Sequence, residues 1–111
     1  MAAKKDVLQK IVALKRQIAE QHVHAAQLKV EKIEVSIESL QTSLKTMDEG
    51  KAGIEAHLLA EAHGHVGRVI KDIATRRGEL SRAQLELYDA REALKRVFHS
   101  QERLGDIAQG K

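Results

Sequence analysis

Histidine is the residue type with the clearest potential for chemistry here, with six copies in 111 residues. Imidazole ligates zinc and titrates near neutral pH. Two pairs lie two residues apart: His22 with His24, and His63 with His65. Side chains two residues apart on a helix point about 200° apart, so neither pair can hold one ion. His57, Glu61 and His65 share a helical face, but no cysteine or fourth ligand accompanies them. We therefore expect no metal site and no cofactor.

Catalytic motifs are also missing from the sequence. It contains no Gly-rich phosphate loop and no Gly-x-Ser-x-Gly elbow. Carboxylates on a thin helical structure stay solvated, because no concave site removes water from them. The sequence predicts that the protein is not an enzyme.

Composition points to long helices with a narrow core. Charged residues make up 32% of the chain, aromatic residues only 2%, and proline is absent. A chain with so few large apolar residues can bury only a thin seam, and nothing forces its backbone out of a helix. We expect an all-α protein with few turns.

Apolar residues recur at steps of three and four, the spacing of a coiled-coil seam. The first series is Val7, Ile11, Leu14 and Ile18, with Asp6 as the expected N-cap. The second is Ala26, Val30, Ile33, Ile37, Leu40, Leu44 and Met47, and it is displaced by one residue from the first. We expect a stutter at His22 to join the two series within one helix.

The third series is Leu80, Ala83, Leu87, Ala90, Leu94, Val97, Gln101, Leu104 and Ala108. It extends backward, with another stutter, through Ile54, Leu58, Ala62, His65, Val69, Ile73 and Arg76. The whole second half can therefore form one helix.

Gly50 and Gly53 follow the last seam residue of the first half and can adopt the positive φ of a helix C-cap. They predict one antiparallel coiled-coil hairpin over residues 1–111, with a first arm over 6–48, a turn over 49–53 and a second arm over 54–108. A rival turn over 63–67 leaves unequal arms. The favoured turn brings together Leu40 with Ala62, Ile33 with Val69, Leu14 with Leu87 and Val7 with Val97.

Charge distinguishes the two ends of this hairpin. The end with both termini has nine basic candidates for partner binding: Lys4, Lys5, Lys10, Lys15, Arg16, Arg91, Lys95, Arg96 and Arg103. Residues 30–62, around the turn, have seven acidic against three basic side chains. A basic end and an acidic tip suit docking to two different protein partners, although mixed charges also simply solvate helices.

Other partners are less well supported. The basic end has no aromatic residues suited to stacking on nucleic acid, and Glu92, Glu102 and Asp106 interrupt it. No stretch is apolar enough for membrane insertion, and the first helix lacks Trp or Phe anchors for a membrane surface. The absence of cysteine and of a signal-peptide pattern favours an intracellular location.

The predicted hairpin, the lack of Pro and Cys, and the charged segment 90–104 resemble one family. This family comprises the small stalk proteins of flagellar and virulence type III export machines. The resemblance implies a cytoplasmic protein, peripheral at the inner-membrane export machine, without cofactor. Its paired terminal arms would enter a hexameric export ATPase and couple that ring to the export gate. The resemblance also implies secretion chaperones as protein partners.

Two other classes of function remain open. The hairpin can act as an adaptor or chaperone that holds a client helix, or it can self-associate into a four-helix bundle. It can also be a plain structural spacer, in which neither charged end matters.

Overall fold

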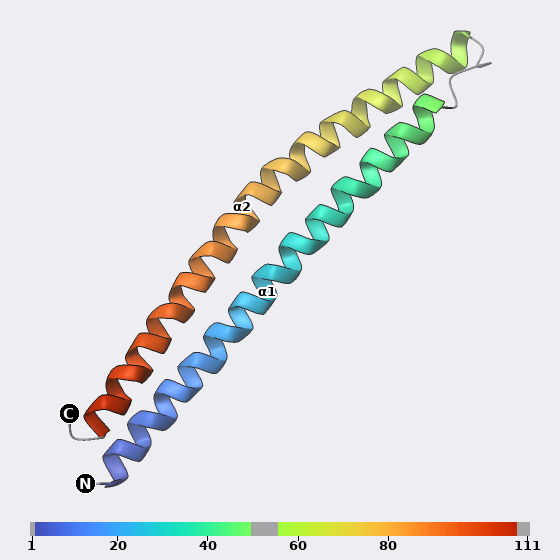
Figure 1. The fold of residues 1–111 in the computed structure, drawn as a ribbon. Coiled ribbons are helices and arrows are strands. Elements are labelled where there is room, and N and C mark those ends of the chain that lie inside the picture. Colours follow the sequence, from blue (N-terminus) through green and yellow to red (C-terminus); the bar gives the residue numbers. More distant parts are fainter. Residues whose placement is uncertain (1, 50–55, 109–111) are drawn as a thin grey trace. The chain divides into compact units, whose positions relative to one another are not determined.

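Two long helices form the described part of the chain in a computed structural model (Figure 1). Helix α1 spans Ala2–Glu49 and α2 spans Ala56–Ala108, and the structure describes residues 2–49 and 56–108. Within these two ranges there is no strand. The helices run antiparallel (Figure 1). The predicted all-α hairpin of two long helices is therefore confirmed.

The helix ends differ from the predicted ones in detail. Helix α1 begins at Ala2, so Asp6 lies in its second turn and the prediction of Asp6 as N-cap is wrong. Helix α2 is described from Ala56, and its predicted start at residue 54 lies outside the described residues. The predicted turn glycines, Gly50 and Gly53, lie outside the described residues. The rival turn over 63–67 is excluded, because α2 passes through it without interruption.

The chain divides into two compact units, and each contains a segment of both helices. The terminal unit consists of Met1–Leu28 and Gln84–Lys111. The distal unit consists of Lys29–Ala83. In each unit a segment of α1 packs against a segment of α2 along a narrow seam.

In the distal unit the seam is almost entirely aliphatic. Its α1 side is formed by Val30, Ile33, Ile37, Leu40, Leu44 and Met47, and its α2 side by Val66, Val69, Ile73, Leu80 and Ala83. All of these side chains are buried or half-buried, and Ala83 is 0% exposed. The seam spacing on α2 also includes Arg76, between Ile73 and Leu80, but this residue is charged and exposed. Its Nη1 donates to Glu79 Oε2 at 2.8 Å, and this hydrogen bond raises the pKa of Arg76 above its ordinary value.

In the terminal unit the seam contains smaller and more polar residues. Its α1 side is Val12, Arg16, Ala19, Val23 and Ala26, and its α2 side is Leu87, Ala90, Leu94, Val97, Gln101 and Leu104. Only Ala19 and Leu87 among them are buried, and each remains 8% exposed. The predicted seam over residues 26–47 and 80–104 is thus confirmed, while Ala108 lies outside the described side chains.

The described seam residues of both helices show no stutter. On α1 the seam residues from Val12 to Met47 follow one another at alternating spacings of three and four. Val23, and not His22, is the seam residue between Ala19 and Ala26. On α2 the same holds from Ala62 to Leu104, and Val66 takes the step assigned to His65. His22 and His65 are both exposed neighbours of the seam. The predicted stutter at His22 is therefore wrong, and the second predicted stutter is absent within residues 62–104, while residues 54–60 lie outside the described side chains.

The register also differs from the predicted one. Leu44 lines the same groove as Val66 and Ile70, whereas the predicted turn would place it opposite Leu58. Arg16 contacts Phe98 and Gln101, whereas the same turn would place it opposite Glu86. Each α1 residue therefore meets α2 about three helical turns later than predicted. Consequently Leu40 and Ala62, Ile33 and Val69, Leu14 and Leu87, and Val7 and Val97 are not facing pairs.

Candidate protein-interaction surface

All nine predicted partner-binding residues belong to the terminal unit, five on α1 and four on α2. Eight of the nine are exposed; Arg16 is half-buried. The antiparallel packing thus brings the basic residues of both arms into one unit, as the sequence suggested.

Arg16 is a seam residue rather than a free surface cation. Its guanidinium Nη1 donates to Gln101 Oε1 at 3.5 Å, and its Cζ lies 5.9 Å from the centroid of the Phe98 ring. Its Nε also forms an ion pair with Glu20 Oε1 at 3.4 Å. These contacts tie Arg16 to the hairpin itself, so we remove it from the docking residues.

The cations on α2 are balanced by neighbouring carboxylates. Lys95 Nζ lies 3.1 Å from Glu92 Oε1, and Arg96 Nε donates to the Glu92 carbonyl oxygen at 3.4 Å. Within Gln84–Lys111 there are five Lys and Arg residues and five Asp and Glu residues. This arm therefore adds no net charge to the terminal unit.

The N-terminal segment of α1 supplies the basic character. Within Met1–Leu28 five Lys and Arg residues stand against only Asp6 and Glu20, and Glu20 is paired with Arg16. The net excess of three positive charges in the whole chain thus lies on this segment.

The predicted acidic tip is not present as a distinct feature. The distal unit has nine Lys and Arg residues and nine Asp and Glu residues, so it is formally neutral. The carboxylates of α1 lie in the same unit as five cations of α2: Arg68, Lys71, Arg76, Arg77 and Arg82. The expectation counted residues 30–62 alone, and all five of these cations lie beyond residue 62 in the chain.

A second surface feature, an exposed apolar stripe on α1, was assigned wrongly from the sequence. We call it the α1 stripe, and it consists of Val7, Ile11, Leu14 and Ile18. Their residues remain 55%, 44%, 56% and 44% exposed, respectively. At 3.6 residues per turn, the centre of the stripe lies on the order of 150° around the α1 axis from the seam. The stripe therefore points away from α2.

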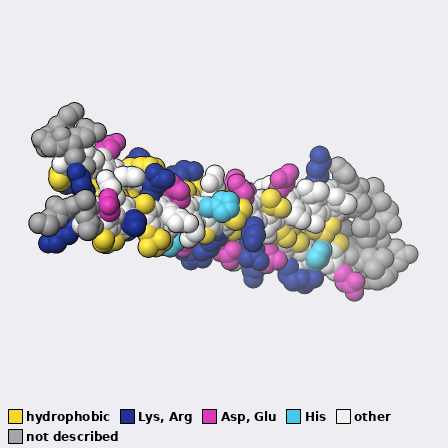
Figure 2. Space-filling view, turned by 90° about the horizontal axis from the view of Figure 1, so that it is seen from below, with side chains coloured by type: hydrophobic (Ala, Val, Ile, Leu, Met, Phe, Trp, Pro, Cys, Tyr) yellow, Lys and Arg dark blue, Asp and Glu magenta, His cyan; other side chains and the backbone are white. Residues whose placement is uncertain are grey.

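Among the described residues of α1, no carboxylate lies directly beside the α1 stripe. Directly beside it on either side are Leu8, Lys10, Lys15 and Gln17, all exposed, and Lys4 stands one step before Val7. Apolar and basic side chains reach the surface over the terminal unit in Figure 2. The stripe with its basic rim is the most distinctive surface of the described chain.

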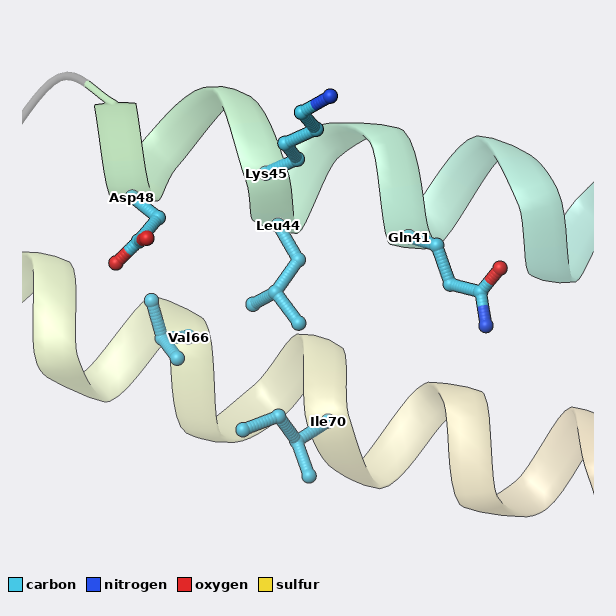
Figure 3. A pocket seen from close by; sticks show the side chains of 6 residues that line it. All are labelled: Gln41, Leu44, Lys45, Asp48, Val66 and Ile70. Carbon is cyan, nitrogen blue, oxygen red and sulfur yellow. The ribbon is translucent and has the colours of Figure 1, made fainter.

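An open groove of about 420 Å³ lies in the distal unit, between α1 and α2 (Figure 3). Leu44 and Val66 point into it from the two helices, Asp48 and Gln41 lie at its edges, and Lys45 points away (Figure 3). Ile70 forms part of its wall and is half exposed. The groove is a continuation of the seam and brings no catalytic set of residues together.

Metal-binding residues are not gathered in the parts of the chain that the structure describes, where no group of three or more His, Cys, Asp or Glu is placed to hold an ion. His22, His24, His63 and His65 are all exposed. The set His57, Glu61 and His65 cannot be judged as a whole, because the side chain of His57 lies outside the described residues.

Neither described helix contains a stretch both long and apolar enough to cross a membrane. Comparison of the chain with protein-family models, with curated proteins and with solved structures finds no match. The likeness to type III export stalks therefore rests on the sequence features alone and stays a prediction.

Proposed function

We propose that the chain is a non-enzymatic helical hairpin that docks to other proteins through its terminal unit. One observation carries this proposal: the terminal unit combines the whole net positive charge with an apolar stripe that α2 does not cover. Exposed apolar residues at coiled-coil spacing favour binding to another helix, and surrounding charge selects the partner.

Within this class, the stalk of a type III export machine is the first candidate. In that role the paired terminal arms bind the opening of a hexameric export ATPase, and the hairpin links the ring to the export gate at the inner membrane. The basic terminal unit supports this role, since an acidic ring opening would attract it electrostatically. The resemblance described above supplies the identity of the partner.

Binding to a cognate export ATPase tests the stalk role. We expect the double variant Lys10→Glu and Lys15→Glu to bind at least tenfold more weakly, because both lysines are exposed on the basic segment of α1. Lys45→Glu is the matched control, since Lys45 is also exposed on α1 but lies in the neutral distal unit. Equal binding by both variants would remove the stalk assignment.

The second candidate is an adaptor or chaperone that holds a client helix, or a hairpin that pairs with itself. The α1 stripe favours this class, because a ring opening recognised by charge alone does not require it. Analytical ultracentrifugation separates the two forms: a monomer fits an adaptor, and a tight dimer fits a four-helix bundle.

A further inference from the structure

The α1 stripe has the spacing of a second coiled-coil seam on the same helix. Val7, Ile11, Leu14 and Ile18 follow one another at steps of four, three and four, and Ala25 and Leu28 continue the series after Gln21. All of these residues lie in the terminal unit. A helix with seams on two opposite faces can pack against one helix on each side. In this unit α2 covers one face, and a further helix fits the other.

A second copy of the chain is a poor partner for this face. The positions beside a coiled-coil seam set partner choice through their charges. Here they are Leu8, Lys10, Lys15 and Gln17. Two stripes packed in parallel would bring Lys10 beside Lys15, and in the antiparallel arrangement Lys15 would meet Leu8 and Lys10 would meet Gln17, so neither direction offers a lysine a carboxylate.

The outer face of α2 does not provide an alternative surface on a second copy. The exposed large apolar residues of α2 in the terminal unit are Leu85, Tyr88, Phe98 and Ile107, and Phe98 lies beside the seam in contact with Arg16. Only Leu85 and Tyr88 are separated by a helical step of three, so they form no stripe of matching length. Another protein is therefore the better source of the partner helix.

A membrane surface is the competing explanation, because basic amphipathic helices bind anionic lipids. The α1 stripe is four residues long and contains no Trp or Phe. Its heptad spacing gives a narrow face, which suits a helix better than the wide apolar face typical of interfacial helices. A helical protein partner is therefore the better match.

We propose that the α1 stripe and its lysine rim bind an amphipathic helix of another protein that has an apolar heptad seam flanked by acidic residues. The apolar seams provide contact area, while acidic flanks opposite Lys10 and Lys15 give charge complementarity. This inference rests on the proposed docking role of the terminal unit and names the kind of helix that the unit accepts.

Two designed peptides of four heptads test the proposal by fluorescence anisotropy with the full chain. Both have Leu and Ile in the seam; one has Glu and the other Lys at the flanking positions. We expect the Glu peptide to bind at least tenfold more tightly at low salt, and to weaken as salt screens the charges. Leu14→Gln should weaken its binding at least tenfold. The matched control Leu85→Gln, on the exposed face of α2, should leave binding unchanged.

Several results would overturn the proposal. These are equal binding of the Glu and Lys peptides, equal loss in Leu14→Gln and Leu85→Gln, or no binding of the Glu peptide. Binding to vesicles containing anionic lipid that depends on Leu14, without peptide binding, would assign the stripe to a membrane. A dimer that dissociates in Leu14→Gln would assign it to a second copy. None of these assays contains the export ATPase, so the stalk role stands or falls separately on the charge-reversal experiment.

Discussion

The guanidinium carbon of Arg16 lies 5.9 Å from the centroid of the Phe98 ring, within the range of a cation–π contact. The two residues belong to opposite arms of the terminal unit. Arg16 also donates to Gln101, the one polar residue on the α2 side of that seam. Polar residues in a coiled-coil seam favour a single register, because displaced pairings leave them without partners. We infer that this cluster fixes the alignment of the two arms.

Arg16→Ala should lower the free energy of unfolding by about 1 to 2 kcal/mol. The variant loses the contact with Phe98, the hydrogen bond to Gln101 and the apolar stem that covers the seam. Lys15→Ala, at the exposed neighbouring position, should change it by less than about 0.5 kcal/mol. Urea unfolding followed by circular dichroism measures both. Equal effects would show that Arg16 is an ordinary surface cation.

Leu14→Gln and Leu87→Gln should have very different effects on stability. Leu87 is buried in the seam, and placing an amide there should cost about 3 kcal/mol or more. Leu14 belongs to the exposed α1 stripe, and glutamine is a good helix former, so its replacement should cost less than about 0.5 kcal/mol. Thermal unfolding compares the two. A large loss in Leu14→Gln would mean that α2 covers the stripe.

Ala83→Leu should destabilise the hairpin by about 1 to 3 kcal/mol, because Ala83 is completely buried and a larger side chain would force the helices apart. Ala93→Leu, at an exposed position of the same helix, provides the control and should be nearly neutral. The difference between the unfolding midpoints of the two variants in urea tests the tight approach at Ala83. A neutral Ala83→Leu would show that the helices are farther apart there.

Gly67→Ala and Gly78→Ala should each raise the free energy of unfolding by about 0.5 to 1 kcal/mol. Both glycines lie within α2, and a Cβ added at either would meet no atom within 4 Å. Alanine reduces the backbone freedom of the unfolded chain and introduces no clash. The gains should add in the double variant, since the sites share no contacts. A loss of stability on calorimetry would indicate a break in α2 near these positions.

The helical class could be predicted because the relevant signals agree. Proline is absent, charged residues are frequent, and residues 26–47 and 80–104 contain apolar side chains at seam spacing. In these stretches no second apolar series competes. The seam residues in these stretches were therefore predicted correctly, although the register between the two helices was not.

The N-terminal part of α1 was assigned wrongly because it contains two overlapping series. The true seam there includes Arg16 and the small residues Ala19 and Ala26, whereas the stripe over residues 7–18 contains larger aliphatic side chains. A prediction based on hydrophobicity alone therefore takes the stripe for the seam. The one-residue displacement between the two series was the available signal for a second surface, but it was interpreted as a stutter.

The register could not be derived from the turn glycines. Placing the reversal at residue 51 shifted every pairing by about three helical turns. The acidic tip has a separate origin: it was inferred from residues 30–62 alone, whereas Arg68, Lys71 and Arg77 of the same unit lie beyond residue 62.

The register and the face that α1 turns to α2 together decide which apolar residues pair and which stay exposed, so oxidative cross-linking is the most direct test of this account. The protein has no native cysteine, which makes introduced pairs unambiguous. We predict that Val23→Cys with Ala90→Cys forms an intramolecular disulfide, because both positions are half-buried in the seam of the terminal unit. Leu14→Cys with Leu87→Cys should remain reduced under the same conditions. Efficient cross-linking of the second pair, with none of the first, would contradict the structure and the docking surface inferred from it.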